Sequence, residues 1–217
     1  MPDPGGPTPP PDDLEAALAR FYDQESRAGT RRVIELGRVA RRDEFVALLA
    51  AEGRVRVVEV GLGTGLDAAA LLGAGLAVAG VDLSDEHVQR CRALGVDAHR
   101  ASATALPFGD ASFDAGWSMS TLLHLPDDET DVALAELVRV VVPGGPVAIG
   151  LWGGFDEAGV QDRDPHLPHR WFRFRTDAQV RATLATHGTV ERFDTWQPDG
   201  DRFTYQWAVL RTPDATP

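Results

Sequence analysis

The stretch from Val57 to Gly65 constrains the fold of this chain more than any other. A short β-branched run passes directly into glycines at 61, 63 and 65, and an alanine- and leucine-rich segment follows. An apolar run of this length is typical of a strand buried on both faces of a parallel sheet. Glycine tolerates positive φ and lets a ligand approach the backbone, and a helix N-terminus offers free N–H groups to polar or anionic groups. The stretch therefore predicts an α/β fold with a ligand-binding turn.

An acidic residue follows the next predicted strand, at 76–81. Asp82 stands at the carboxyl end of that strand, roughly 20 residues after the first glycine, where a carboxylate can accept hydrogen bonds from ribose hydroxyls. A dinucleotide fingerprint would need a glycine at position 66, which is Leu66 here. The pattern predicts a ribose-containing ligand and departs from the dinucleotide fingerprint.

Hydrophobic periodicity predicts the other elements of the chain. Further strands are expected at 96–100, 115–119, 146–152, 190–196 and 203–210, the last two joined by a turn at 198–200. Helices are expected from Leu14 after a cap at Asp12 or Asp13, around Val33–Val39, at Asp43–Ala51, after a cap at Ser84, and at Thr176–His187. The arginines around the second helix indicate a solvated face, with an anion site as the alternative.

Several motifs resemble one enzyme family. The pattern Glu-x-Gly-x-Gly-x-Gly at 59–65 resembles motif I of the class I S-adenosylmethionine-dependent methyltransferases, and Asp82 resembles their ribose-binding motif. Later family motifs are matched by Leu106–Asp114, Ser120–Asp127 and Leu134–Gly145. The resemblance, to small-molecule methyltransferases with a type 11-like domain, implies a three-layer Rossmann-like α/β sandwich. Its seven-stranded sheet is mostly parallel with a reversed last strand, and an N-terminal helical lid is added.

The resemblance also implies S-adenosyl-L-methionine as the cofactor. Its methionine part would lie against the glycine turn, its ribose at Asp82, and its adenine near positions 83, 102 and 103. The implied cofactor-binding residues are Glu59, Gly61, Gly63, Gly65, Asp82, Leu83, Ser102, Ala103 and Ser118. The family usually has an aspartate where Ser102 stands, and a hydroxyl can still accept a hydrogen bond there.

Methyl transfer is an in-line displacement in which the protein mainly aligns the reacting atoms. If the nucleophile is a hydroxyl of a small metabolite, a base must accept its proton, and His124 is the candidate by motif position. Tyr22 resembles an aromatic position of the family's lid and is a second candidate catalytic residue. A structural hydrogen bond for His124, helix packing for Tyr22 and a nitrogen nucleophile stay open as alternatives.

The predicted organisation is a single domain at 12–212 between a disordered tail at 1–11 and a short tail at 213–217. The domain divides into a helical lid at 12–52, a cofactor-binding core at 53–152, an irregular substrate loop at 153–175 and C-terminal elements at 176–212. Lid and loop are expected to cover the methyl group, with apolar walls from Trp152, Phe155, Trp171 and Phe172. Arg170 and Arg173 are expected to pair with an acidic group of the substrate.

The composition of the chain limits which classes of partner and cofactor it is expected to bind. The net charge of −12 argues against nucleic acid, because phosphate binding depends on Lys and Arg. All 21 basic residues are arginine, which excludes a P-loop lysine and a Schiff-base lysine. Cys91 is the single cysteine, so we expect a reducing cytoplasm, no intrachain disulfide and no metal site. No apolar run approaches the roughly 18 residues of a membrane span, no signal sequence is recognisable, and a homodimer stays open.

Two other functions compete with methyl transfer. One is a protein that binds S-adenosylmethionine without catalysis, which the replacement of the usual aspartate by Ser102 keeps open. The other is an NAD(P)-dependent oxidoreductase on a similar sheet, which Leu66 and the later motifs disfavour.

Overall fold

The computed structural model describes residues 10, 13–29, 35–161, 164, 166–198 and 203–215. Several expected features lie outside these residues: the tail at 1–11 apart from Pro10, the alternative cap Asp12, Val33 and Ile34 of the second helix, and Asp199–Gly200 of the last turn. No helix in the described part of the chain combines the length and apolarity that a bilayer crossing requires.

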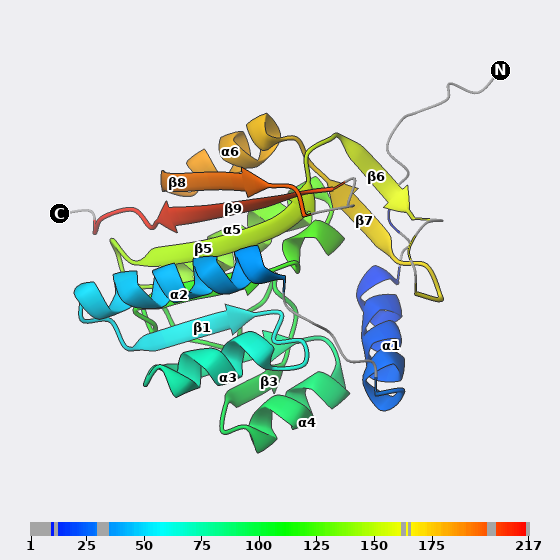
Figure 1. The fold of residues 1–217 in the computed structure, drawn as a ribbon, viewed down its shortest axis with the longest axis horizontal. Helices are drawn as coiled ribbons and strands as arrows, with labels where there is room; N and C mark the ends of the chain where they lie inside the picture. Colours follow the sequence, from blue (N-terminus) through cyan, green and yellow to red (C-terminus); the bar gives the residue numbers. More distant parts are fainter. Residues whose placement is uncertain are drawn as a thin grey trace.

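A seven-stranded sheet forms the centre of the molecule (Figure 1). Its strands are β1 Arg56–Val60, β2 Ala77–Asp82, β3 Asp97–Arg100, β4 Ala115–Met119, β5 Pro146–Gly153, β8 Thr189–Trp196 and β9 Thr204–Arg211, in the spatial order β3-β2-β1-β4-β5-β9-β8. β9 is antiparallel to both of its neighbours, and the remaining pairs are parallel. This confirms the predicted mostly parallel sheet with a reversed last strand.

β1 lies inside the sheet because its side chains are apolar on both faces. Val57 and Val58 are each 0% exposed, and they pack into two core clusters on opposite sides of the sheet. Successive residues of a strand point to opposite faces, so a run of valines serves both clusters at once. In the ladder, Val57 is the partner of Val78 on β2 and of Ala115 on β4.

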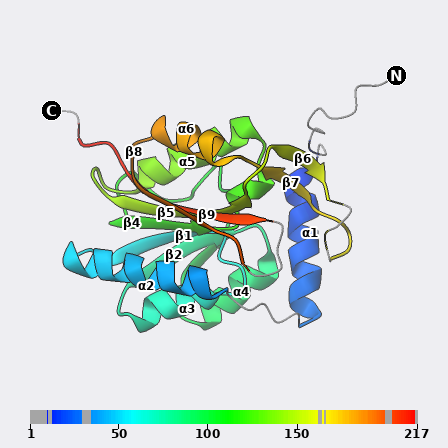
Figure 2. The ribbon, with the colours of Figure 1, turned by 45° about the horizontal axis from the view of Figure 1, so that its top comes forward.

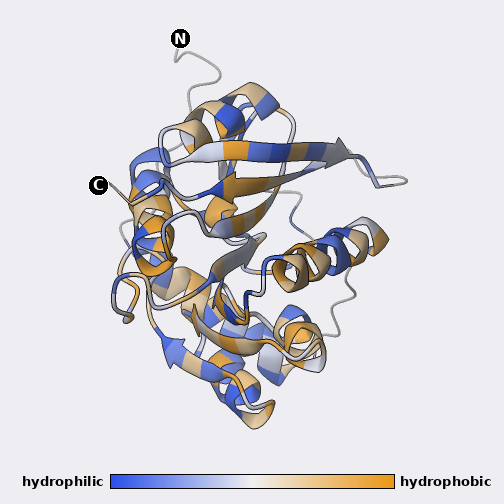
Figure 3. Ribbon diagram, turned by 90° about the vertical axis from the view of Figure 1, so that its left-hand side faces the viewer, coloured by the Kyte–Doolittle hydropathy of each residue, from blue (hydrophilic) through white to orange (hydrophobic). Residues whose placement is uncertain are grey.

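Helices cover both faces of the sheet, which confirms the three-layer sandwich. α2 Leu36–Ala51, α3 Leu66–Gly73 and α4 Asp85–Ala93 lie on one face, and α5 Asp127–Val140 and α6 Asp177–Ala185 on the other (Figures 1 and 2). Polar and apolar residues alternate along these helices, as expected for elements with one buried face (Figure 3). α1 Leu14–Arg27 stands apart from the layers, beyond the carboxyl ends of the parallel strands (Figure 2).

The N-terminal helices differ from the prediction. The described residues from Leu36 to Ala51 form one helix, so no new helix begins at Asp43. The Glu35 side chain caps α2 by accepting hydrogen bonds from the N–H groups of Gly37 and Arg38, a role for which Ser, Thr, Asp and Asn are the usual signals. Asp13 precedes α1 but makes no cap hydrogen bond, because its carboxylate binds Arg20 instead.

The segment predicted as an irregular loop contains a small second sheet. β6 Glu157–Val160 pairs in antiparallel fashion with β7 Trp171–Phe174. Two four-residue strands separated by a long connection give too short an alternation to be recognised in sequence. The hairpin places β7 beside the short 3-10 turn η1 Leu122–His124, which follows β4.

Candidate functional site

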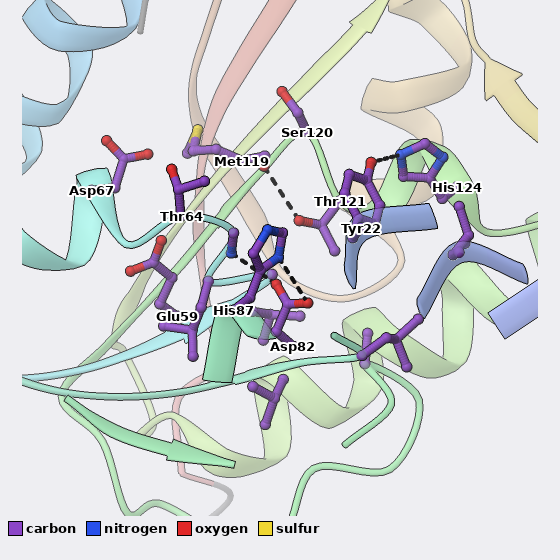
Figure 4. Close-up of a pocket in the computed structure, with 18 of the residues that line it drawn as sticks. Tyr22, Glu59, Thr64, Asp67, Asp82, His87, Met119, Ser120, Thr121 and His124 are labelled. Carbon is purple, nitrogen blue, oxygen red and sulfur yellow. Dashed lines mark hydrogen bonds and ion pairs between the residues drawn. The ribbon is translucent and has the colours of Figure 1, made fainter. Parts of the chain in front are cut away.

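A cavity of about 480 Å³ lies at the carboxyl ends of β1, β2 and β4, between the sheet and α1. Parallel strands bring the residues that follow them to one edge of a sheet, which is where open α/β sheets bind ligands. The wall combines the turn after β1, the end of β2, the segment 119–125 after β4, and side chains from α1 and α2 (Figure 4). Of the sequence-predicted site residues, Tyr22, Glu59, Gly61, Gly63, Asp82, Leu83, Ala103 and His124 line this cavity.

The glycine turn has the backbone that its sequence predicts. Gly61, Gly63 and Gly65 have φ angles of 84°, 52° and 78°, in the left-handed region that favours glycine. A Cβ on Gly63 would meet no atom within 4 Å, so the space beside it is open to a ligand. A Cβ on Gly65 would instead contact Leu94 and Cys91 of the α4 region, and Gly65 does not line the cavity. Its role is to begin α3.

Asp82 ties the end of β2 to the glycine turn. Its Oδ2 accepts a hydrogen bond from the N–H of Gly63 at 2.8 Å. Its Oδ1 accepts one from the N–H of Ser84 at 2.9 Å and lies 3.4 Å from Nδ1 of His87. The carboxylate is therefore held in one orientation at the cavity wall.

Two residues predicted to contact the cofactor, Ser102 and Ser118, do not line the cavity. Ser118 is 1% exposed, and its hydroxyl donates to the carbonyl of Val60 within the sheet, so its side chain is used inside the core. The Ser102 hydroxyl donates to Glu15 of α1 and lies 2.7 Å from the Thr104 hydroxyl. Both hydroxyls are thus used in contacts within the protein.

Glu59 is a buried carboxyl group in the cavity wall. It is 3% exposed, and its Oε2 has no hydrogen-bond partner in the described part of the chain. Burial raises the pKa of Glu59 well above its usual range, and the negative charge of Asp67 adds to this effect. A cationic group placed against Glu59 would supply the missing partner and favour the ionised form.

Arg38 supplies positive charge at the same end of the cavity. Its Nη2 donates to Asp67 at 3.1 Å, and Arg42 holds the other oxygen of that carboxylate at 3.1 Å. Nε of Arg38 is buried without a partner among the described residues, while the side chain reaches the cavity. The two arginine side chains are only 19% and 13% exposed, so for them a solvated helix face was the wrong interpretation. Asp67 in the first turn of α3 was the signal that sequence reasoning missed.

The other end of the cavity holds an oriented histidine. Nδ1 of His124 lies 3.1 Å from the carbonyl oxygen of Trp171, and Nε2 lies 2.8 Å from the Tyr22 hydroxyl. A carbonyl oxygen can only accept, so the hydrogen-bond network assigns the ring proton to Nδ1 and makes Nε2 the acceptor. The Tyr22 hydroxyl therefore donates to His124; a dashed line marks this contact in Figure 4.

Arg170 completes this group from the other side. Its Nη1 donates to the Tyr22 hydroxyl oxygen at 3.0 Å, and its guanidinium carbon lies 4.7 Å from the centre of the Phe21 ring. Asp164 binds Arg170 through two hydrogen bonds of 2.7 and 2.9 Å. A line of polar groups thus runs from Asp164 through Arg170 and Tyr22 to His124.

The residues predicted to contact the substrate differ in where they lie. Trp152 lines the cavity, whereas Trp171 is buried against Leu14 and Leu18 of α1. Phe155 packs on Phe174, and Phe172 packs on the His124 ring with centroids 4.7 Å apart. The two predicted substrate-binding arginines are neutralised within the chain: Asp164 holds Arg170, and Asp127 and Asp156 hold Arg173.

Backbone strain marks the segment after β4. Ser120 has a φ of 55°, a left-handed value that non-glycine residues rarely adopt, and it lines the cavity. Its hydroxyl lies 3.3 Å from that of Tyr205. Such strain is concentrated at functional sites, where the surrounding structure enforces it. Among the described residues, no cluster of three or more His, Cys, Asp or Glu side chains is arranged to hold a metal ion.

Residues 58–149 match the sequence model of a family described as a methyltransferase domain. This match covers the strand, the glycine turn, Asp82 and His124 that define the cavity. Residues 58–149 therefore belong to this methyltransferase family, and the match supports a class I methyltransferase that uses S-adenosylmethionine. The family predicted from the glycine turn and the later motifs is confirmed.

A curated relative supports this family assignment. The O-methyltransferase cnsE of Penicillium expansum is 34% identical over 138 residues, which are 59% of this chain and 48% of that protein. The chain thus spans about half the length of the curated relatives that it matches.

Solved structures show the same fold over nearly the whole chain. The 1,6-didemethyltoxoflavin-N1-methyltransferase of Burkholderia thailandensis has a TM-score of 0.72 at 23% identity, covering 96% of this chain and 93% of that one. The [4+2]-cyclase SpnF has a TM-score of 0.71 at 21% identity, covering 97% and 100%. A cyclase on the same fold shows that the fold alone does not determine the reaction.

Proposed function

We propose that this protein transfers a methyl group from S-adenosylmethionine to a hydroxyl oxygen of a small molecule. The observation that carries the proposal is the hydrogen-bonded pair Tyr22–His124, which faces the same cavity as the glycine turn and Asp82. A proton acceptor of fixed tautomer is what a hydroxyl nucleophile requires.

The residues at the glycine-turn end fit the cofactor. Its ammonium matches the unpartnered oxygen of Glu59, its carboxylate matches Arg38, and its ribose hydroxyls match Asp82. The open space beside Gly63 allows the chain of the methionine part to pass close to the backbone. Leu83 and Ala103 offer apolar surface for the adenine. When bound, the cofactor supplies a methyl carbon activated by a sulfonium.

The residues at the other end can move the substrate's proton. The Tyr22 hydroxyl donates to His124 and its oxygen accepts from Arg170, so Tyr22 links the cavity to a proton acceptor and to a positive charge. As the substrate oxygen attacks the methyl carbon, its proton passes to the Tyr22 oxygen and the proton of Tyr22 passes to Nε2 of His124. The cofactor, held by Glu59, Arg38 and Asp82, would supply the methyl carbon and would retain the electron pair of the methyl–sulfur bond as a neutral thioether. Arg170 stabilises negative charge on the Tyr22 oxygen during this transfer.

A small molecule is the substrate class that the site supports. A cavity of about 480 Å³ beneath a helix falls within the usual size range of small-molecule sites. The net charge of −12 is unfavourable for nucleic acid. The relative from Penicillium expansum is an O-methyltransferase, which supports oxygen, whereas the structural neighbour from Burkholderia thailandensis methylates nitrogen.

Two measurements test this proposal. Titration calorimetry with S-adenosylhomocysteine and, separately, NADH should show binding of the first alone; binding of NADH alone would favour an oxidoreductase. The protein should then be incubated with S-adenosylmethionine and a panel of soluble phenols, alcohols and amines, with methylated products identified by mass spectrometry. Methylated phenols or alcohols support the proposal. Cofactor binding without transfer to any member of a broad panel would favour a non-catalytic protein.

A further inference from the structure

His87 is a buried histidine in the cavity wall that lies next to Asp82 (Figure 4). It is 2% exposed and stands in the first turn of α4, where its N–H donates to the Ser84 hydroxyl at 3.1 Å. Its ring centre lies 5.6 Å from that of Tyr22 on α1. The imidazole is therefore held between the carboxylate at the end of β2 and the helix that covers the cavity.

One nitrogen of this imidazole lacks a partner. Nδ1 of His87 faces Asp82, and because a carboxylate oxygen accepts, the neutral ring carries its proton on Nδ1. Nε2 is then an acceptor, and it is buried without a hydrogen-bond partner among the residues that the structure describes. Native proteins rarely leave a buried polar atom unpaired, since the loss weakens folding, so a ligand is a natural source of the missing donor.

The hydrogen bonds of Asp82 point to the same ligand group. A carboxylate offers about four acceptor positions. The N–H groups of Gly63 and Ser84 and the Nδ1–H of His87 occupy three of them. One position is left, on the oxygen that binds Gly63, whereas a ribose presents two neighbouring hydroxyl donors. Asp82 in this arrangement can accept from one of them.

We propose that His87 is a ribose-binding residue, whose Nε2 accepts a hydrogen bond from one ribose hydroxyl of S-adenosylmethionine while Asp82 accepts from the other. The proposal rests on the cofactor of the family and is independent of whether the substrate nucleophile is oxygen or nitrogen. It gives the imidazole a positioning role toward the cofactor and none in proton transfer.

The test is calorimetric titration of S-adenosylhomocysteine and its 2′-deoxy and 3′-deoxy analogues into three proteins: the unaltered chain, His87→Phe and His87→Gln. Phenylalanine keeps the ring beside Tyr22 but removes both nitrogens, and glutamine keeps an amide oxygen near the position of Nε2. In the unaltered protein, each deoxy analogue should bind about 10-fold more weakly than the parent compound. His87→Phe should bind the parent compound more weakly than the unaltered protein does, by a similar factor. It should bind one of the two deoxy analogues as tightly as it binds the parent. His87→Gln should recover part of the affinity.

A matched control is His99→Phe, since His99 lies on β3 and does not line the cavity; it should leave all three affinities unchanged. For each protein, the affinity for a deoxy analogue is compared with the affinity for S-adenosylhomocysteine. If this ratio is the same in His87→Phe as in the unaltered protein for both analogues, His87 contacts neither hydroxyl and the proposal is wrong. A lower melting temperature with unchanged affinity would likewise leave only a structural role. Should His87→Phe not fold, the unaltered protein with ¹⁵N-labelled histidine decides. The Nε2 resonance of His87 should shift with S-adenosylhomocysteine and shift less with one deoxy analogue; equal shifts with all three ligands would overturn the proposal.

Discussion

The two ends of the cavity are assembled in different ways. At the cofactor end, the glycine turn and its carboxylate are close in sequence, since the Gly63–Asp82 hydrogen bond joins residues 19 positions apart. At the substrate end, Tyr22 bonds His124 and Arg170 across 102 and 148 positions. A site made by one strand–turn–helix unit can be recognised from a short pattern. A site made by α1, η1 and β7 together exists only when the whole chain has folded.

His124→Asn should produce the largest effect and separate the two ends most clearly. Asparagine keeps a donor for the Trp171 carbonyl but removes Nε2, the acceptor for Tyr22. O-methyl transfer should fall about 10²–10⁴-fold, the usual contribution of a general base. Affinity for S-adenosylhomocysteine should change less than about threefold. His187→Asn, a histidine outside the cavity, is the control and should leave both quantities unchanged. An unimpaired His124→Asn enzyme would remove this base from the mechanism.

Gly63→Val should disable the cofactor end by about 100-fold or more in affinity for S-adenosylhomocysteine. A branched side chain would occupy the open space beside the turn and disfavour its left-handed φ. Gly75→Val is a matched control, because Gly75 also has a left-handed φ and open space but lies outside the cavity. Both variants should lose similar stability, measured by thermal unfolding. Equal affinities in the two variants would mean that the turn is structural only.

Arg38→Met should weaken cofactor binding by about 10-fold, since a charge-assisted hydrogen bond to the carboxylate is lost. Arg41→Met, on the same helix, serves as the control because Arg41 pairs with Glu44 and Asp194 away from the cavity. An analogue of S-adenosylhomocysteine that lacks the carboxylate makes the comparison more specific. Arg38→Met should bind that compound as well as the unaltered protein does. A tenfold difference between the two proteins for this ligand would show that Arg38 acts on something else.

Glu59→Gln should have two smaller effects of opposite sign. It should raise the melting temperature at pH 8 by a few degrees, and it should weaken cofactor binding. Burial raises the pKa of Glu59 above its value in the unfolded chain. The stability of the folded protein therefore falls as the pH rises from the unfolded to the folded pKa, and the uncharged amide of glutamine removes this loss. Asp114, at the opposite end of the sheet, provides the contrast.

Although burial opposes it, hydrogen bonds from Arg56 and from the N–H groups of Val55 and Arg56 lower the pKa of Asp114 to about 2. Its stabilisation is present above the unfolded pKa of about 3.9 and is lost as pH falls toward 2. Asp114→Asn should therefore destabilise the protein at pH 8 and lose that effect near pH 2. Thermal unfolding of both variants across pH measures this, and a stabilised Asp114→Asn protein at pH 8 would contradict the electrostatic account.

The sequence predicted the cofactor end better than the substrate end for a physical reason. The strand at 115–119 follows from local periodicity, and the reversed last strand follows from the family that the motifs indicate. Arg38 and His87 were not predicted as site residues, because each depends on which side chain of another helix or strand lies beside it. Ser118 was placed by motif position, yet its hydroxyl points into the sheet. The β6–β7 hairpin is stabilised by tertiary packing, and its four-residue strands are too short to be recognised from the sequence.

Methyl transfer from S-adenosylmethionine labelled with ¹³C in its methyl group tests the central claim most directly. The unaltered protein should be incubated with the labelled cofactor and compounds that carry both a hydroxyl and an amine, and the products examined by NMR. Transfer to oxygen should give the O–¹³CH₃ resonance, and His124→Asn should form this product about 10²–10⁴-fold more slowly while still binding S-adenosylhomocysteine. Labelled methyl found only on nitrogen, or an O-methyl product formed equally by His124→Asn, would contradict the account.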